Sequence, residues 1–192
     1  MDLTLTQEQR LFRSVAREFL DREVVPHRMA WDRMESVDTA ILPKLGEMGF
    51  FGLTIPEEYG GFGGDYLTYA IGMEELGRAD SSVRGIVSVS SGLVGKVVLS
   101  HGTEEQKQQY LPGISAGTLL GCFGLTEPDS GSDPASLSTQ AVRDGDDWVL
   151  DGQKMFITNA SWAQVCLVFA RTGGPGPKGI SAFLVPTDSH GF

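Results

Sequence analysis

Apolar residues recur at helical spacing through the first two thirds of the chain. Leu11, Val15 and Phe19 lie four positions apart, shortly after Thr6. A threonine followed three residues later by a glutamine is the capping-box pattern that opens helices. The spacing therefore predicts an amphipathic helix that begins after Thr6 and ends near Pro26.

The same reasoning predicts further helices. They cover 38–48, a segment capped by Asp65 with Gly77 at its C-terminal end, 82–100, and a short helix that runs from a second capping box at Thr103 to about 112. The 82–100 segment is apolar on almost every side, which is typical of a central helix. Each of its glycines costs about 1 kcal/mol of helix propensity relative to alanine. We expect them to permit close packing or the passage of a ligand.

The period changes to that of strands from residue 119 onward. Candidate strands are 119–126, 137–143, 148–151, 154–158, 165–171 and 180–186. Gly145 lies in an Asp-Gly-Asp-Asp stretch that predicts a hairpin turn. The expected fold is α+β: an all-helical N-terminal domain, residues 1–118, followed by the first part of an antiparallel β domain, residues 119–192.

Composition narrows the possible partners. The 192 residues suffice for one large or two small domains, and the net charge is −10, from 15 basic and 25 acidic residues. This balance argues against nucleic-acid binding, which needs basic side chains along a surface. The start of the sequence shows no basic stretch followed by an apolar core, so we expect no signal peptide. We also expect no apolar run of the ~20 residues that a membrane span needs.

The cysteines and histidines predict neither a metal site nor a disulfide. Cys122 and Cys166 both lie in apolar runs, so we expect buried, reduced thiols. His27, His101 and His190 are far apart in sequence, and no metal-ligand spacing occurs. The expected location is cytoplasmic, where thiols stay reduced.

The stretch 122–134 joins the helical part to the strand part. An apolar run leads into a loop of Pro, Gly, Ser and Asp, whose backbone amides and small hydroxyls can approach an oxygen-rich ligand closely. Ligands often bind at boundaries between domains. Taken alone, Thr126 and Thr158 are ordinary strand residues and Ser132 is an ordinary turn residue.

Two acidic residues of this loop have competing interpretations. Glu127 and Asp133 are either a catalytic acid pair or structural residues. We favour the structural role, because Glu127 is placed to accept bonds from loop amides and Asp133 to cap a turn.

Five segments in the same order resemble motifs of the acyl-CoA dehydrogenase family of flavoproteins, with the glutaryl-CoA dehydrogenase branch nearest. They are 55–61 (IPEEYGG), 74–77 (EELG), 102–112 (GTEEQKQQYLP), 124–133 (GLTEPDSGSD) and 152–160 (GQKMFITNA). The likeness covers the whole chain. Members of that family continue for roughly as many residues again through a helical C-terminal bundle, which this sequence lacks.

The resemblance implies an oxidoreductase of CH–CH groups that carries out FAD-dependent α,β-dehydrogenation of an acyl thioester. In that family a carboxylate removes the α-proton while a hydride leaves the β-carbon for the flavin. The base lies in the C-terminal half of family members. We therefore name no catalytic residue in this sequence and expect the chain alone to be inactive.

The resemblance also implies cofactor contacts. The residues expected at the flavin are Phe123, Gly124, Leu125, Thr126, Gly131, Ser132, Phe156, Ile157 and Thr158. Within this set Phe123, Leu125 and Thr126 would lie along the pyrimidine edge. Ser132 would also touch the substrate, and Phe156 to Thr158 would cover the ring system. The family often has Trp where this chain has Phe156.

Arg84 is the candidate for substrate specificity. It stands beside Gly85 on the apolar 82–100 segment, and a buried arginine needs an anionic partner. In the glutaryl-CoA dehydrogenase branch an arginine here meets the distal carboxylate of the substrate, so both residues are candidates for substrate binding. The alternative is an ion pair with a neighbour such as Asp80 or Glu75.

The implied partners are an acyl-CoA or acyl-carrier-protein thioester, with a dicarboxylyl group as one possibility, and electron-transfer flavoprotein or a similar acceptor. The family is usually homotetrameric, so a homo-oligomer is expected of the complete protein. Two alternatives stay open. One is a non-catalytic fragment or split subunit that lends part of a flavin site to a partner; the other is a flavin monooxygenase or nitroalkane oxidase.

Overall fold

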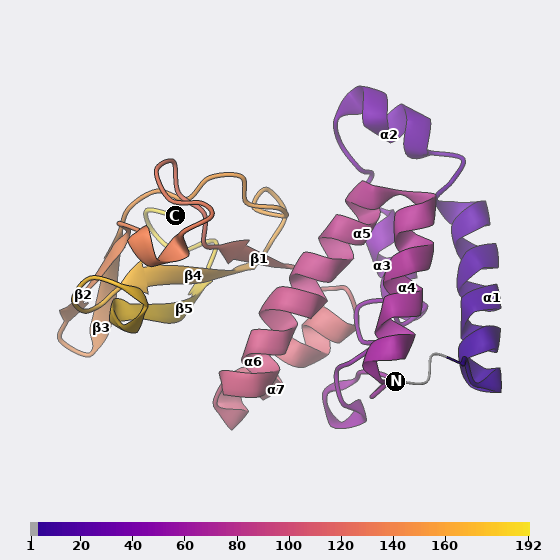
Figure 1. Ribbon diagram of the computed structural model, residues 1–192, viewed down its shortest axis with the longest axis horizontal. Coiled ribbons are helices and arrows are strands. Elements are labelled where there is room, and N and C mark those ends of the chain that lie inside the picture. Colours follow the sequence, from indigo (N-terminus) through magenta and orange to yellow (C-terminus); the bar gives the residue numbers. More distant parts are fainter. Residues whose placement is uncertain (1–3) are drawn as a thin grey trace. The chain divides into compact units, whose positions relative to one another are not determined.

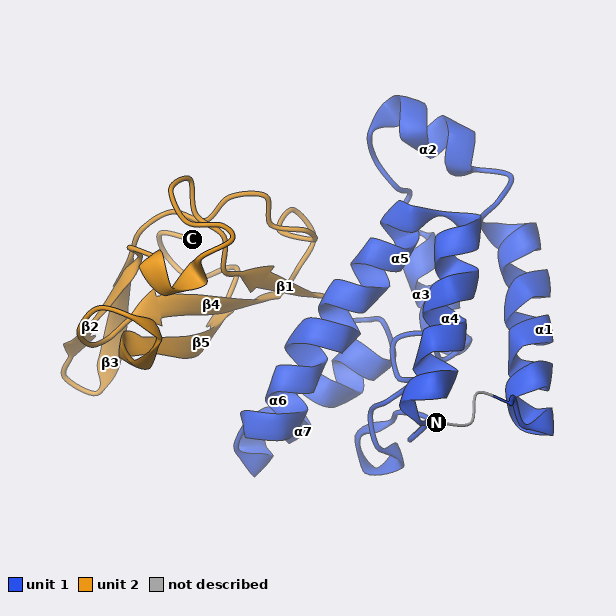
Figure 2. Cartoon of the chain, viewed as in Figure 1, with its two compact units in different colours: residues 1–119 blue, residues 120–192 orange. Residues whose placement is uncertain are grey.

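The computed structural model describes residues 4–192 and consists of two compact units (Figure 2). Unit 1 comprises residues 1–119 and is helical; unit 2 comprises residues 120–192 and contains a sheet. The chain is therefore α+β, an all-helical part followed by a part built on a sheet, as the sequence predicts.

Unit 1 is built from helices joined by short turns (Figure 1). They are α1 (Gln7–Glu23), α2 (Arg28–Met34), α3 (Ile41–Glu47), the 3₁₀ turn η1 (Glu57–Tyr59), α4 (Tyr66–Ala79), α5 (Ser81–Val87), the π-helical segment η2 (Ser88–Gly95), α6 (Lys96–His101) and α7 (Glu104–Ser115). Helix α4 packs between α1 and α5. The core includes Leu20, Leu45, Phe50 and Leu76, all fully buried.

Both predicted capping boxes form. The Thr6 hydroxyl accepts from the Gln9 amide at 3.1 Å, and the Thr6 amide donates to the Gln9 side chain at 3.0 Å; Thr103 and Gln106 repeat the arrangement at α7. The predicted end at Gly77 is wrong, because α4 continues to Ala79. Asp80 ends that helix and caps α5 through the amides of Ser82 and Val83. Helix α2 was not predicted.

The stretch Ser81–His101 is one continuous helical rod of 21 residues with a mean hydropathy of 1.4. By length and composition alone it is long and apolar enough to cross a membrane, which corrects the expectation that no run reaches that length. Core helices meet the same criteria, and one side of this rod is buried within unit 1 through Val83, Val87 and Val94. The stretch is therefore weak evidence for a membrane span.

Unit 2 contains a mixed five-stranded sheet (Figure 1). Its strands are β1 (Gly121–Gly124), β2 (Gln140–Asp144), β3 (Asp147–Asp151), β4 (Val165–Arg171) and β5 (Ile180–Pro186), with the 3₁₀ turns η3 (Pro134–Ser136) and η4 (Pro177–Gly179) between them. The order is β1-β4-β2-β3, and β5 lies on the other edge of β4.

The predicted all-antiparallel sheet is wrong in part. Strands β2–β3 and β4–β5 pair antiparallel, but β1 pairs parallel with β4, and β2 also meets β4 in parallel at one residue pair. Parallel strands need a long crossover, and the forty residues between β1 and β4, which include the β2–β3 hairpin, supply it. The hairpin turn itself is as predicted, with Gly145 at φ 62°.

The predicted strand 154–158 does not form. Phe156 adopts φ 59° and Asn159 φ 70°, both in the left-handed region, which is incompatible with a continuous extended strand. The segment is a loop instead.

Candidate functional site

The loop after β1 is organised around the buried carboxylate of Glu127. It accepts hydrogen bonds from the Ser138 amide at 2.6 Å, the Ser138 hydroxyl at 2.8 Å and the Thr139 amide at 3.0 Å, and it pairs with the Lys154 ammonium at 2.8 Å. Burial alone would raise the pKa of Glu127, but the ammonium and the amides hold that pKa well below its usual range. All of its acceptor capacity is therefore used structurally.

Asp133 also has a local structural role. Its carboxylate accepts from the Ala135 amide at 3.2 Å and caps η3. The amide bonds of Glu127 and this cap are the contacts that the sequence predicts for the structural interpretation of the two acids. Their separate bonds give no support to a catalytic pair.

Segment 154–159 lies alongside β1 and the residues that follow it. The Lys154 ammonium donates to the Leu125 carbonyl at 3.2 Å, and the Met155 amide donates to the Thr126 carbonyl at 2.9 Å. The structure thus brings two groups of predicted cofactor residues, Leu125–Thr126 and 156–158, onto adjoining segments that are about thirty positions apart in the sequence.

Phe156 is exposed and conformationally strained. Its side chain is 86% exposed although it is a large aromatic, and its φ of 59° is uncommon for a residue with a Cβ atom. Left-handed geometry costs a non-glycine residue about 1–2 kcal/mol, and strain of this kind gathers at binding sites. An exposed aromatic ring on a backbone that is strained in this way is consistent with a surface that binds a ligand.

Several polar groups of the predicted site have no partner within residues 4–192. They are the amide and hydroxyl of Thr126 and the hydroxyls of Ser132 and Thr158. Gly131 faces open space, since a Cβ atom there would meet nothing within 4 Å. Unused donors together with an exposed aromatic ring fit a flavin, which has polar pyrimidine atoms and a flat apolar ring. Within the described part of the chain, neither Gly131 nor Ser132 forms a hydrogen bond with 156–158.

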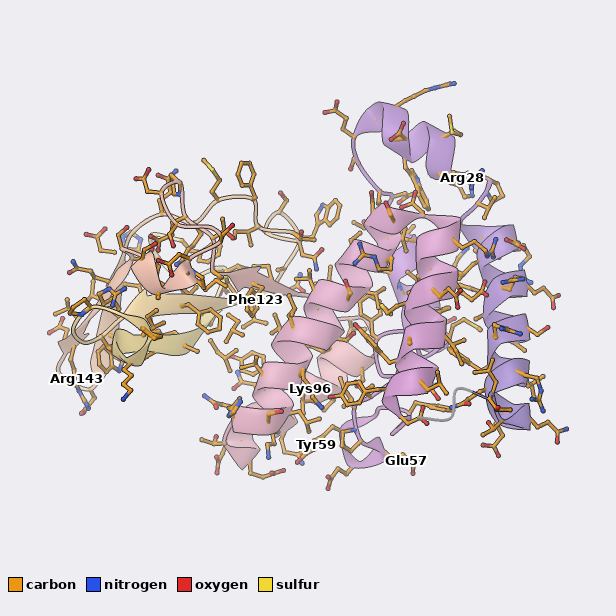
Figure 3. The ribbon with its side chains drawn as sticks, in the orientation of Figure 1. Arg28, Glu57, Tyr59, Lys96, Phe123 and Arg143 are labelled. Atoms are coloured by element: carbon orange, nitrogen blue, oxygen red, sulfur yellow. The ribbon has the colours of Figure 1, made fainter. Side chains whose placement is uncertain are left out.

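A hollow of about 560 Å³ lies on unit 2 beside β1, β4 and β5, and its volume is in the range of small-molecule sites. It is lined by Phe123, Leu125, Asp133, Pro134, Ala135, Phe169, Pro177, Ile180, Ser181 and Ala182. Phe123, on β1 (Figure 3), has its ring 5.1 Å from that of Phe169. The strand alternation that turns Phe123 and Leu125 to one face is visible in the sequence, but the contributions of β4 and β5 were missed.

The side of β1 opposite Phe123 is closely packed. Gly124 approaches Cys166, whose sulfur lies 3.1 Å from where a Cβ atom of that glycine would stand. Cys122 and Cys166 are register partners, and both are buried and unbridged, as predicted. Gly124 thus serves strand packing in this structure.

Arg171 was not predicted, and it braces the rim of the hollow. From the end of β4 its guanidinium donates to the carbonyls of Ala135 at 2.8 Å, Leu137 at 2.9 Å and Gly174 at 2.8 Å. It ties the η3 and η4 loops to the sheet. An arginine at the end of an apolar strand is a weak sequence signal, since such residues are usually solvated.

Arg84 is half-buried on α5 and has no carboxylate within ion-pair distance in the described part of the chain. Its guanidinium donates to the Ser88 hydroxyl at 3.3 Å. The alternative of a pair with Asp80 or Glu75 is wrong, because Asp80 caps α5 and Glu75 is held by Arg17 and Arg78. Gly85, beside it, has open space at its Cα atom.

Comparisons with known proteins place this fold in one family. Residues 6–118 match the family model of the acyl-CoA dehydrogenase N-terminal domain, and residues 122–192 match that of the middle domain. The chain belongs to the acyl-CoA dehydrogenase family.

Three relatives illustrate the likeness. The short-chain specific acyl-CoA dehydrogenase of Clostridium acetobutylicum is 42% identical over the whole chain, which spans 51% of that protein. A chain in a structure of the electron transferring flavoprotein of Acidaminococcus fermentans is 41% identical with a TM-score of 0.95, covering 100% of this chain and 50% of that one. Glutaryl-CoA dehydrogenase from Mycobacterium smegmatis in complex with FADH2 is 39% identical with a TM-score of 0.92, covering 98% and 47%.

The chain therefore spans about half the length of the relatives it matches.

Proposed function

We propose that this chain forms the N-terminal half of an enzyme that carries out FAD-dependent α,β-dehydrogenation of an acyl thioester. The observation that carries the proposal is the pairing of Leu125–Thr126 with the 154–159 segment, which sets unused donors beside an exposed, strained Phe156. Family membership and a relative solved with FADH2 support the same cofactor.

FAD, when bound, supplies the acceptor for the hydride of the substrate. The residues of this chain would bind and orient. The Thr126 amide and hydroxyl would hold the pyrimidine edge, Phe156 and Ile157 would cover the ring and exclude water, and the Thr158 and Ser132 hydroxyls would donate to ring and thioester. No base for the α-proton is assigned to residues 4–192, since the two buried acids Glu75 and Glu127 are fully engaged.

The first test is FAD binding by the purified chain, followed through quenching of flavin fluorescence. We expect Thr126→Val to weaken binding by about three- to tenfold, the cost of one hydrogen bond, and Thr126→Ser, which keeps the hydroxyl, to change it far less. Failure of the wild-type chain to bind FAD, alone or with the C-terminal half of a relative, would overturn the proposal.

The substrate proposal is a thioester whose acyl group ends in a second carboxylate. It is supported by Arg84, a half-buried guanidinium that has no anionic partner within residues 4–192 and stands beside open space at Gly85. We expect Arg84→Met to weaken binding of a dicarboxylyl thioester about tenfold or more, because hydrogen bonds to charged groups contribute about 1.5–3 kcal/mol. Binding of the monocarboxylyl thioester of equal chain length should not change. Equal losses for both ligands would refute this assignment.

The remaining parts of the proposal follow from the family alone. They are a CoA or carrier-protein thioester, electron-transfer flavoprotein or a similar acceptor, a cytoplasmic location and a homo-oligomeric complete protein. A second candidate is a non-catalytic or split subunit that contributes part of a flavin site to a partner chain. Binding of FAD only after addition of the C-terminal half of a relative would favour this second candidate.

A further inference from the structure

Segment 154–159 is fixed to β1 and its continuation at both ends. At the first end, the Lys154 ammonium bonds the Leu125 carbonyl at 3.2 Å and the Glu127 carboxylate at 2.8 Å, and the side chain of Lys154 is only 13% exposed. At the second end, the buried Asn159 amide group donates to the Gly121 carbonyl at 3.1 Å. One attachment reaches Gly121, the first residue of β1, and the other reaches residues just beyond the end of that strand at Gly124.

The middle of the segment, in contrast to its attached ends, is exposed. Phe156 and Thr158 are exposed, and the Thr158 hydroxyl has no partner in the described part of the chain. Phe156 and Asn159 both have positive φ, so the backbone departs from its preferred conformation at each end of this exposed stretch.

Strained backbone persists only where the surroundings determine it. Here the surroundings are the side-chain bonds of Lys154 and Asn159, together with the bond from the Met155 amide to the Thr126 carbonyl at 2.9 Å. An arrangement held in advance spares a ligand the entropy of ordering the loop on binding. The attachments therefore have a consequence for ligand affinity, in addition to their local bonds.

We propose that Lys154 and Asn159 are positioning residues that hold 156–158 as a preformed platform against β1, so that a flat aromatic ligand binds without ordering the loop. The identity of the ligand as flavin rests on the proposed function; the holding of the platform does not. The Lys154 ammonium is itself held in place by Glu127, whose carboxylate also accepts hydrogen bonds from the backbone amides of Ser138 and Thr139.

The platform is tested without ligand by hydrogen exchange of the intact chain. Lys154→Met removes the charge and both bonds, and Asn159→Gly removes the side chain while tolerating the left-handed backbone. Lys178→Met, at an exposed lysine of the same unit, is the control. We expect each platform variant to speed exchange across 154–159 about tenfold or more, with β4 and β5 amides unchanged.

Unaltered exchange at 154–159 in both variants would overturn the platform. A uniform rise over the whole of unit 2 would also overturn it, since that is the signature of a general stabilising role. These outcomes are independent of any cofactor.

The flavin arm uses FAD itself as the probe. We expect Lys154→Met and Asn159→Gly to raise the dissociation constant for FAD about tenfold and to lessen the shift that binding causes in the visible flavin absorption band, with Lys178→Met unchanged. Wild-type affinity and band shape in a variant whose exchange has risen would overturn the ligand-positioning role. Absence of FAD binding by the wild type would count against the proposed function, and hydrogen exchange would then decide the platform.

Discussion

At the scale of single residues, unit 2 places a fully hydrogen-bonded carboxylate next to a residue with a strained backbone. Glu127 receives four hydrogen bonds in a buried position, whereas Phe156, held on the adjoining segment, is exposed and left-handed. A protein selected for stability alone would place glycine or asparagine at such a φ. The choice of phenylalanine points to a use for the ring itself.

Replacement of Phe156 by glycine should separate stability from binding. Because the ring is 86% exposed, little burial is lost, and relief of the left-handed strain should leave the free energy of unfolding unchanged or raise it by up to about 1 kcal/mol. Affinity for FAD should fall at the same time. Urea unfolding and FAD titration measure the two effects.

Phe62→Gly is the matched control, since Phe62 is 63% exposed but not among the residues with positive φ. It should lose stability, because glycine adds entropy to the unfolded chain. A loss of stability in Phe156→Gly as large as in this control would contradict the idea that strain is kept at 156 for a ligand.

At the scale of elements, local signals predicted most of what formed. The capping boxes at Thr6 and Thr103 and the glycine turn at Gly145 are short-range chemistry, and each is present. The contiguous motifs 124–133 and 152–160 indicated the candidate site for the same reason. Their mutual contact through Lys154 and Met155 depends on the tertiary fold and was not visible in the sequence.

The errors have tertiary causes. Segment 154–158 has a strand-like composition, but its attachment at Lys154 and Asn159 imposes a loop. The parallel pairing of β1 with β4 depends on a crossover that alternation of side chains cannot reveal. The alternative ion pair of Arg84 with Glu75 does not form, because Arg17 on α1, far away in the sequence, binds Glu75.

At the scale of the whole molecule, each unit contains one buried, hydrogen-bonded glutamate. Glu75 in unit 1 is bound by Arg17 and Arg78, and Glu127 in unit 2 by Lys154 and backbone amides. Burial opposes ionisation of both, yet the cationic partners prevail and the pKa of each is lowered. The two units therefore share one kind of acid sensitivity although their folds differ.

Both units should lose stability as the pH falls, each through its own glutamate. A carboxylate with a folded pKa below its unfolded value of about 4.3 stabilises fully above that value and progressively less as pH falls toward the folded pKa. Glu127→Gln should cost unit 2 about 3–5 kcal/mol at neutral pH, because Lys154 is left buried without its charge partner, and the deficit should shrink in acid. Hydrogen exchange resolved by unit between pH 7 and pH 3 measures this, with exposed Glu58→Gln as the control. A deficit that stayed constant across that range would show that the charge of Glu127 is not what holds its neighbours.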